Sequence, residues 1–594
     1  MKKTPTREDI SEKYKWAVND IYATDELWEK DYNELIQASE KESGYKGKST
    51  ESKENLYNAI RESEEIDFMV ERVYVYAFMR YYEDTTNGKY QEMSGKAQMA
   101  ASKLAEKYAF LEPEILSMEE NVLRDWIKDG ELKLYARMIE DMLAEKEHSL
   151  SEKEEALLAK ASQVTTVPNE VFSKFNNADV KFGSIKDEDG NEAELTNGKY
   201  TLYMESQNRQ VRKDAFYGLY SQYKGHINTL AACFYGNVKQ AMFNAQARKY
   251  NSTMEMYLSG SFIPTKVYTN LIETVDKNLS LMHRYVALRK KELKVDELHF
   301  YDVYAPMVDN YKWEISYNEA KEMILNALKP MGEEYLSIVK EGLENGWVDV
   351  YENVGKRTGA FSWGVYGTHP YLFLNYSNTL NDVFTLIHEM GHSMHTYYSN
   401  KTQPFAYAGY KIFVAEVAST CNESLLMNYL LDNCKDKTQK KYLLNHYMEQ
   451  FKGTLFRQTM FAEFEMQVHR MAEEGTVLSA ENLCRVYKEL NKKYFGEEMV
   501  IDDEIACEWA RIPHFYTPFY VYQYATGYSA AIAISSRILA GDKQVIEGYK
   551  KFLSGGSSMH PIELLKLCNI DMEKPQVVED ALKVFEGLLD EWNN

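Results

Sequence analysis

The run His388-Glu389-Met390-Gly391-His392 constrains the fold of this chain more than any other feature. On an α-helix, residues four positions apart lie on one face, so the two histidines can bind one metal ion together. Glu389 points away from that line but can still reach a water molecule on the ion. Apolar neighbours recur at helical spacing, and no proline falls between residues 371 and 403. The sequence therefore predicts an amphipathic or buried helix that carries the parts of a zinc hydrolase site.

A catalytic zinc site needs a third protein ligand and one open position for water. A third histidine would require the pattern H-E-x-x-H-x-x-G-x-x-H, but this chain has His395 in place of the glycine and Tyr398 in place of the histidine. The acidic residues between Ser393 and Leu430 are Glu416 and Glu423, within a second predicted helix. A carboxylate among apolar residues is costly to bury unless it is paired or bound to a metal. We therefore expect Glu416 to be the third ligand.

Other polar residues near these helices have less specific interpretations. Glu423 lies two turns beyond Glu416, where it could hydrogen-bond a ligand histidine or be an ordinary solvated charge. His395 is interpreted as a substrate-side or packing residue. Cys421 is interpreted as a small packing residue, because a ligand role would duplicate Glu416.

Composition narrows the classes of partner and location. The 69 basic and 91 acidic residues give a net charge of −22, which argues against nucleic acid as a partner and favours cationic peptides by long-range attraction. No apolar run approaches the ~20 residues of a membrane span. The first residues lack the apolar core of a signal peptide. The six cysteines are far apart and form no C-x-x-C motif, so free thiols in a reducing cytoplasm are expected.

The chain reads as mostly helical, with two non-helical islands. Residues 1–173 form a predicted N-terminal helical region, with helices at Asp25–Ser39, Glu51–Arg61, Ile66–Tyr82, Gln91–Phe110 and Glu131–Lys146. Residues 174–202 predict a β-hairpin and a domain boundary, because an extended segment precedes an Asp-Gly turn. Residues 203–594 then form a predicted helical catalytic domain. Within it, Ser554–Ser558 is a loop that could face the site, although a flexible connector is favoured.

The second island, residues 347–377, predicts a small sheet. Its last strand, Pro370–Tyr376, leads into the predicted zinc helix. An exposed edge strand beside a metal could hold an extended peptide by main-chain pairing, which tolerates many side chains. The alternative is an ordinary buried strand.

The motif and its surroundings resemble the thimet-oligopeptidase-like zinc metallopeptidases, and within them the oligoendopeptidase F group. The resemblance is carried by Gly359–Ser362, His388–His392, Phe413–Thr420 and His514–Gly527, and these separate pieces occur in that family's order. It covers residues from about 200 to 585. It implies a large multi-helix zincin-type fold with a small β-sheet near the active site and a deep substrate channel. It also implies one Zn2+ held by His388, His392 and Glu416, with Glu389 as catalytic base and short peptides as substrates.

Residues 514–528 contain His514 and five tyrosines, any of which could donate a hydrogen bond to an oxyanion. In the resembling enzymes, a His- and Tyr-bearing segment in this region supplies such donors. We select His514 and Tyr524, with Tyr520 next; the alternative for each is packing in the core. Arg511 could pair with a substrate carboxylate or with Asp502, Asp503 or Glu504.

The sequence therefore predicts a cytoplasmic zinc endopeptidase acting on short oligopeptides. A zinc exopeptidase, either dipeptidyl or carboxypeptidase, would use the same chemistry. A non-catalytic, zinc-stabilised helical binding protein is a third alternative. The presence of Glu389 argues against it, because structural zinc sites usually have four protein ligands. The oligomeric state is left open by the sequence.

Overall fold

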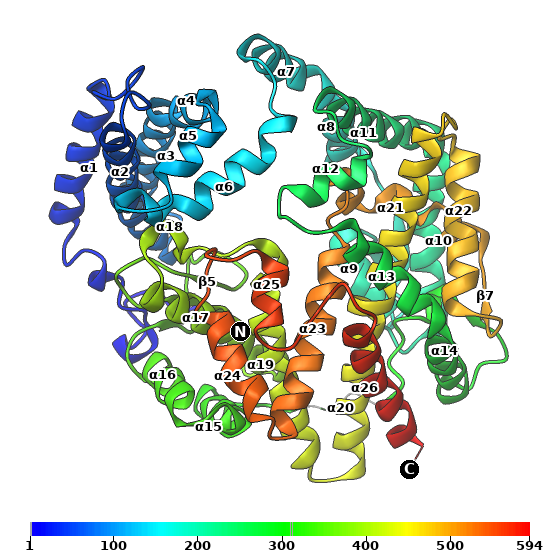
Figure 1. The fold of residues 1–594 in the computed structure, drawn as a ribbon. Coiled ribbons are helices and arrows are strands. Elements are labelled where there is room, and N and C mark those ends of the chain that lie inside the picture. The colour runs from blue at the N-terminus through cyan, green and yellow to red at the C-terminus, as the bar shows by residue number, and fades with distance from the viewer. Residues whose placement is uncertain (1–2, 309–310, 312, 594) are drawn as a thin grey trace. The chain divides into compact units, whose positions relative to one another are not determined.

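The computed structural model describes residues 3–308, 311 and 313–593, and it is mostly α-helical with short strands (Figure 1). This confirms the predicted fold class. The chain forms two compact units. Unit 1 contains Met1–Glu147, Trp313–Tyr429 and Ile534–Asn569, and unit 2 contains His148–Lys312, Leu430–Ala533 and Ile570–Asn594. The predicted division into residues 1–173, 174–202 and 203–594 stays a prediction. None of the helices described is both long and apolar enough to cross a bilayer.

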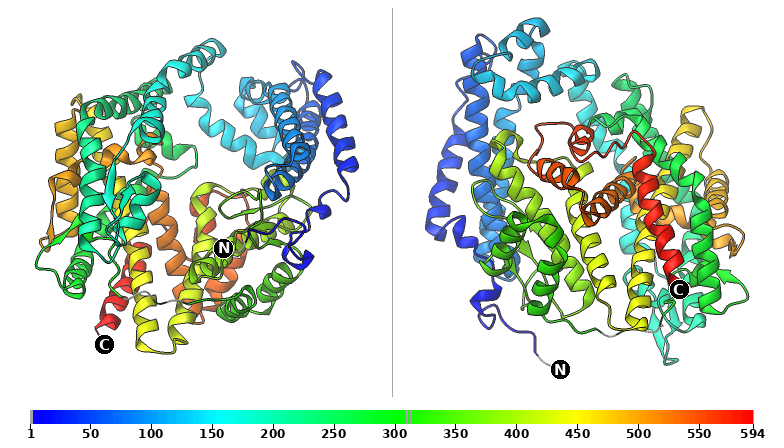
Figure 2. Two further views of the ribbon diagram at one scale, coloured as in Figure 1. Left: turned by 180° about the vertical axis from the view of Figure 1, so that it is seen from behind. Right: turned by 60° about the horizontal axis from the view of Figure 1, so that its bottom comes forward.

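Unit 1 begins with three helices that run side by side (Figures 1 and 2), α1 (Asp25–Glu40), α2 (Lys53–Glu83) and α3 (Gly88–Tyr108). The two helices expected at 51–61 and 66–82 are one helix, α2. The residues between them contain no proline or glycine, and Arg61 reaches Glu65 one turn later at 3.1 Å, which supports continuous helix. Three shorter helices follow, α4 (Leu111–Ser117), α5 (Glu120–Trp126) and α6 (Ala136–Glu145).

A three-stranded sheet lies in unit 1, with strand order β4-β6-β5. β4 (Val348–Asp349) pairs with β6 (Tyr371–Phe373) in parallel, and β5 (Phe361–Trp363) pairs with β6 antiparallel. The last strand before the predicted zinc helix is therefore the central strand, and its three apolar side chains are fully buried. It matches the buried alternative, whereas β5 is an edge strand of the described sheet.

The remaining helices of unit 1 surround this sheet and the H-E-x-x-H segment. That segment lies in α17, which begins after Thr379; the Thr379 hydroxyl accepts a hydrogen bond from the Asp382 N–H at 3.2 Å. The helices are α15 (Tyr317–Ala327), α16 (Glu333–Glu344), α17 (Leu380–Thr402), α18 (Phe405–Ala408), α24 (Lys543–Leu553) and α25 (Pro561–Lys566). The chain passes between the units within α19 (Ile412–Asp432) and α23 (Tyr522–Leu539).

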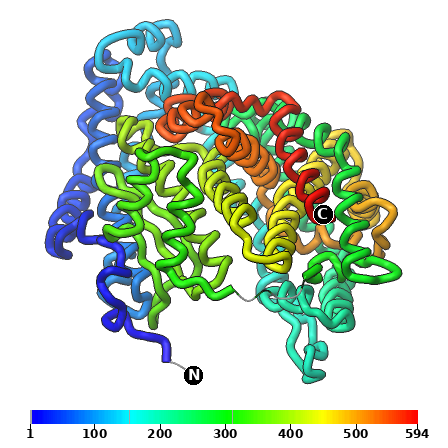
Figure 3. Tube along the Cα trace, turned by 90° about the horizontal axis from the view of Figure 1, so that it is seen from below, coloured from blue at the N-terminus to red at the C-terminus, as the bar shows by residue number. Residues whose placement is uncertain are grey.

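Unit 2 contains the predicted hairpin and most of the remaining helices. β1 (Ser184–Lys186) and β2 (Glu192–Glu194) pair antiparallel around an Asp-Gly turn, and β3 (Leu298–His299) pairs in parallel with β7 (Met499–Val500). The last helix, α26 (Gln576–Trp592), packs beside α20 (Lys437–Gln450) (Figure 3). The helices are α7 (Glu152–Thr165), α8 (Val167–Lys174), α9 (Asn197–Met204), α10 (Arg209–Gly225), α11 (Ile227–Ala247), α12 (Thr253–Ser259), α13 (Thr265–Lys277), α14 (Leu279–Leu293), α20 (Lys437–Gln450), α21 (Arg457–Glu473), α22 (Ala480–Phe495) and α26 (Gln576–Trp592).

The loop at 554–558 makes specific contacts with the end of α17 and the residues that follow it. The Ser554 carbonyl accepts hydrogen bonds from Thr402 at 2.7 Å and Gln403 at 2.8 Å, at the end of α17. The Ser557 N–H donates to the Tyr407 carbonyl at 2.9 Å. Gly556 has φ +52°, and a Cβ there would lie 2.0 Å from the Tyr407 carbonyl oxygen. The loop therefore closes over the end of the helix that carries the histidines.

Replacing Gly556 with alanine should destabilise unit 1, because the added methyl group meets backbone that cannot move alone. We expect a loss of more than ~2 kcal/mol, measured as a lower midpoint of thermal or urea unfolding. Gly541→Ala is the matched control, since Gly541 also has positive φ but has open space around its Cβ position. Equal losses in both variants would show that the loop contact is not responsible.

Candidate metal centre

His388, His392 and Glu416 come together in unit 1 from two helices. The Nε2 atom of each histidine lies 3.4 Å from the same carboxylate oxygen, Oε2 of Glu416. The ligand atoms of all three lie within 4.8 Å of one another. The rings of His388 and His392 are 4.9 Å apart and nearly perpendicular, as expected for residues one turn apart that face a common point. The three residues predicted as metal ligands are thus brought to one place.

The glycine inside the motif allows this convergence. A Cβ at Gly391 would lie 2.6 Å from the Ser419 Cα and 2.7 Å from the Ala418 carbonyl oxygen, so the backbones of α17 and α19 touch there. Glu416 lies one turn before Ser419, on the part of α19 that this contact holds against α17. The Ser419 hydroxyl also donates to Glu416 Oε2 at 2.9 Å, which fixes the carboxylate.

Glu423 orients the first histidine. Its carboxylate forms a short hydrogen bond with Nδ1 of His388. If Nδ1 carries the proton, the lone pair of Nε2 faces Glu416, where a metal would need it. Burial would lower the pKa of His388, but the bond to Glu423 and the nearby carboxylates raise it to about 9 in the metal-free chain. Of the two alternatives for Glu423, the solvated charge is excluded by this contact.

Glu389 is a buried carboxyl with one free oxygen. Its side chain is on the same helix as the two histidines, the residue is 8% exposed, and Oε2 has no hydrogen-bond partner among the described residues. Burial raises the pKa of Glu389, although His388 and His392 oppose that shift. An unpaired oxygen in such a place can accept and return a proton.

The donor set fits a catalytic zinc ion. Two imidazoles and one carboxylate are a known ligand combination for such sites, and three protein ligands leave a position for water. The orphaned oxygen of Glu389 is a further sign of fit, because a buried carboxylate oxygen without a partner is costly unless another group occupies the site.

His514, Tyr520 and Tyr524 form a separate cluster in unit 2. Tyr524 lies with its hydroxyl 3.4 Å from Nε2 of His514, and its ring is 5.5 Å from that of Tyr520. The His514 ring is 6.3 Å from the Tyr520 ring and nearly parallel to it. Tyr520 lies just before α23 rather than within it. His514 is exposed and the two tyrosines are half-buried, so all three can meet a ligand.

The other tyrosines of this tract belong to the core. Tyr516 stacks on Phe172 at 4.2 Å, and Tyr522 lies 4.9 Å from the ring of Tyr268. Tyr528 is also buried. These three tyrosines therefore pack in the core, whereas Tyr520 and Tyr524 are partly exposed to solvent.

Glu465 holds the backbone of the segment 514–528 in place. This residue was not identified from the sequence. It is fully buried, and its Oε1 accepts a hydrogen bond from the Phe519 N–H at 2.9 Å. Phe519 has φ +55°, a left-handed conformation that is strained for a bulky residue. Burial raises the pKa of Glu465 to about 8, against the effect of that hydrogen bond. The only sequence signal was an acidic residue among apolar ones in α21, the same signal that identified Glu416.

Arg511 has a different partner from those predicted. It pairs with Glu508 at 3.0 Å and donates from Nε to the Tyr220 hydroxyl at 3.1 Å. Arg457 reaches the same carboxylate at 2.6 Å. The structure matches neither alternative for Arg511, because its carboxylate partner is Glu508, one turn away on the same helical segment. With both cations on one buried carboxylate, Arg511 is part of the support of this region rather than a free anchor for a substrate.

His395 is a packing residue. It is fully buried, and its ring stacks on Tyr410 at 3.7 Å with an angle of 5° between the planes. Burial lowers the pKa of His395 to about 3, so it stays neutral. The substrate-side alternative for His395 does not hold.

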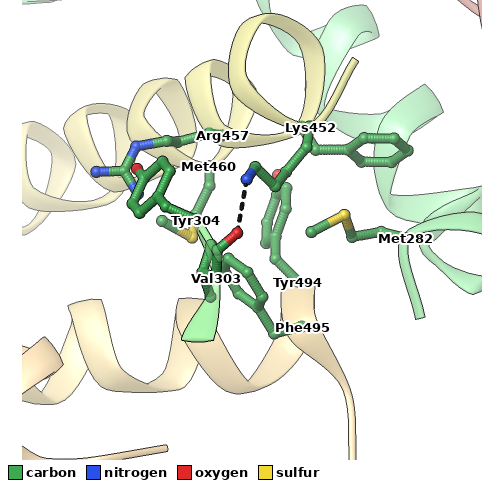
Figure 4. A pocket seen from close by; sticks show the side chains of 9 residues that line it. Met282, Val303, Tyr304, Lys452, Arg457, Met460, Tyr494 and Phe495 are labelled. Carbon is green, nitrogen blue, oxygen red and sulfur yellow. Dashed lines mark hydrogen bonds between the residues drawn. The ribbon is translucent and has the colours of Figure 1, made fainter. Parts of the chain in front are cut away.

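A small cavity in unit 2 is too small to bind a substrate. Lys452, Tyr304, Arg457 and Met282 are among its lining residues, and Lys452 donates to the Val303 carbonyl at 3.0 Å (Figure 4). Its volume of about 10 Å³ is enough for one water molecule at most.

Comparisons with known proteins identify the relatives of the chain. Residues 202–584 match the profile of Peptidase family M3, and residues 114–182 match that of Oligopeptidase F. The chain is 51% identical to Oligopeptidase PepF of Bacillus subtilis, over 99% of this chain and 88% of that protein. It is 41% identical to an Oligoendopeptidase F homolog of Lactococcus lactis, over 98% of each.

Solved structures give the same result. The crystal structure of oligoendopeptidase-F from Enterococcus faecium superposes with a TM-score of 0.74 at 37% identity, covering 96% of this chain and 98% of that one. A crystal structure from Chlamydophila abortus superposes with a TM-score of 0.93 at 34% identity, covering 99% of each chain.

Replacing Gly391 with alanine should weaken metal binding, because the methyl group would force α17 and α19 apart and move Glu416 from the histidines. We expect the zinc dissociation constant to rise roughly 10- to 100-fold, as for other changes that misplace ligands, measured by chelator competition. Gly95→Ala is the control, since Gly95 is in helix α3 of the same unit with open space at its Cβ position. Unchanged affinity in Gly391→Ala would mean that the helix contact does not position the ligands.

Proposed function

The chain belongs to peptidase family M3, and on that basis we propose that it is a zinc-dependent endopeptidase that cleaves internal peptide bonds of short oligopeptides. The main support for this proposal is the arrangement of four side chains in unit 1. His388, His392 and Glu416 converge from two helices, and Glu389 holds a buried, unpartnered carboxyl oxygen on the same helix as the histidines. We assign the three converging residues as ligands of one zinc ion per chain.

Each residue of the site has a distinct role in the proposed hydrolysis. A bound zinc ion would polarise the scissile carbonyl and make a water molecule more acidic. Glu389 takes the proton of the attacking water and later delivers it to the leaving amine. Glu423 keeps His388 in the tautomer that presents Nε2, and Ser419 keeps Glu416 oriented. The raised pKa of Glu389 matches a group that must both accept and release a proton.

We assign His514 and Tyr524, with Tyr520 next, as donors to the negative oxygen that develops during attack. Their mutual contacts and their exposure support the assignment, since Tyr516, Tyr522 and Tyr528 of the same tract are core residues. A phenol or imidazole that donates to the developing charge lowers the barrier without changing the zinc ligands. Glu465 would act indirectly, by holding Phe519 and thus the backbone between the donors.

Edge strand β5 is our candidate for main-chain recognition of the peptide. The Ser362 hydroxyl lies 2.8 Å from that of Ser393, which follows the ligand His392 in sequence, so β5 is held beside the metal helix. Pairing with a strand reads the peptide backbone and allows varied side chains. A deep channel that admits only short peptides remains a prediction from the family resemblance. The net charge of −22 would favour cationic peptides.

We also propose a cytoplasmic location, which the six unpaired cysteines support. The absence of nucleic acid from its partners stays a prediction from the negative net charge.

Peptides blocked at one or both ends distinguish internal cleavage from end trimming. We expect peptides acetylated and amidated at their ends to be hydrolysed at internal bonds, at rates similar to unblocked peptides of the same sequence. Products are identified by mass spectrometry over a series of peptide lengths. Cleavage that requires a free terminus would identify an exopeptidase, and intact peptides with zinc-loaded protein would favour the binding protein.

Glu389→Gln should lose peptidase activity and keep its metal. The amide preserves shape but cannot accept the proton of water, so we expect kcat to fall roughly 10²- to 10⁴-fold or more. Metal analysis of the same sample should still find about one zinc per chain. Activity near that of the unchanged enzyme would exclude Glu389 as the base, whereas loss of zinc would make it a ligand.

A further inference from the structure

Two cysteines that are distant in sequence face each other in unit 2. Cys484 lies in α22, and Cys507 lies in the 3-10 helix Asp503–Arg511, here called the 503–511 segment. Their sulfur atoms are 3.8 Å apart. A disulfide bond has a sulfur–sulfur length of ~2.05 Å, so the two sulfur atoms would need to approach by roughly 1.8 Å to form one.

Flanking contacts hold the two elements in register around this pair. The Tyr487 hydroxyl donates to Glu508 at 2.6 Å, and Lys488 forms an ion pair with Asp503. Cys484, Tyr487 and Lys488 occupy one face of α22, because they are three and four residues apart. Glu508 is fixed from the other side by Arg457 and Arg511. The two sulfur atoms therefore lie in an interface between α22 and the 503–511 segment that several side-chain contacts hold in place.

The surroundings make Cys484 the more reactive thiol. Cys484 is half-buried, whereas Cys507 is buried. The Trp509 indole N–H donates to the Cys484 sulfur at 3.4 Å. A hydrogen bond from Cys507 lowers the pKa of Cys484, with help from Trp509 and the Lys224 charge, while the same pairing raises the pKa of Cys507. A partly exposed thiolate beside a second thiol is the arrangement of a reactive and a resolving cysteine.

We infer that Cys484 and Cys507 form a peroxide-oxidisable dithiol site that closes reversibly to a disulfide between α22 and the 503–511 segment. The Cys484 thiol first loses its proton, and the thiolate attacks one oxygen of hydrogen peroxide. The O–O bond breaks, a sulfenic acid forms, and the released hydroxide takes up the proton that Cys484 lost and becomes water. The Cys507 sulfur then attacks the Cys484 sulfur. The S–O bond breaks, and the departing hydroxyl leaves as water with the Cys507 proton. Two thiols are oxidised to one disulfide, and one peroxide is reduced to two waters.

The crosslink would tie down the segment that leads to His514. The 503–511 segment ends three residues before His514, and it carries the Glu508–Arg511 pair. Oxidation would therefore fix the position of this segment on α22. The inference does not depend on the proposed peptidase chemistry, because it concerns thiols in unit 2 and is measured without substrate.

The test is peroxide treatment of the folded, full-length protein followed by alkylation, digestion and mass mapping without reduction. We expect a linked pair of peptides containing Cys484 and Cys507, a free-thiol count that falls by two, and recovery of both thiols with dithiothreitol. Cys434 is the matched control, since it is half-buried and its thiol donates to the Leu431 carbonyl at 2.9 Å. It should stay reduced under the same dose.

Cys507→Ser isolates the first step. Without its resolving partner, Cys484 should stop at sulfenic acid and be trapped by dimedone, whereas the unchanged protein should give little adduct. Cys484 oxidised to sulfinic acid without the linked peptide, or loss of Cys434 at the same rate as Cys484, would overturn the inference. So would linkage of Cys484 to any other cysteine.

Discussion

The contact between the backbones of α17 and α19 at Gly391 is the constraint on which the candidate metal centre depends. A periodic helix alone places His388 and His392 on one face. Only the crossing of a second helix, with Ser419 against Gly391, brings Glu416 to both imidazoles. Any side chain at position 391 would separate the helices. The glycine is therefore as much a part of the site as the residues that would bind the ion.

Around that crossing, neighbouring side chains hold two of the three candidate ligands and the helix that carries the histidines. Glu423 fixes His388, Ser419 fixes Glu416, and Ser393 ties α17 to edge strand β5. One carboxyl oxygen of Glu389 is also buried with no partner among the described residues. A carboxyl group without a fixed partner, on the helix of the two histidines, is the proton acceptor that the proposed hydrolysis requires.

Sequence reasoning succeeded where the determinants are local or chemically costly. Helical periodicity placed His388 and His392, and the cost of an unpaired carboxylate among apolar residues pointed to Glu416. It was incomplete in three other places. Arg511 pairs with Glu508, one turn away on its own segment, and the two helices expected at 51–61 and 66–82 are one continuous helix, α2. Only the central position of the strand before α17 is decided by tertiary pairing. Glu465 and the Cys484–Cys507 pair depend on contacts between distant segments, which no local pattern reveals.

X-ray absorption at the zinc edge of the loaded protein tests the central claim most directly. The account predicts one zinc per chain with two imidazole nitrogens, one carboxylate oxygen and an exchangeable water, and loss of the carboxylate contribution in Glu416→Ala. Sulfur in the first coordination sphere, or a spectrum that Glu416→Ala leaves unchanged, would contradict it.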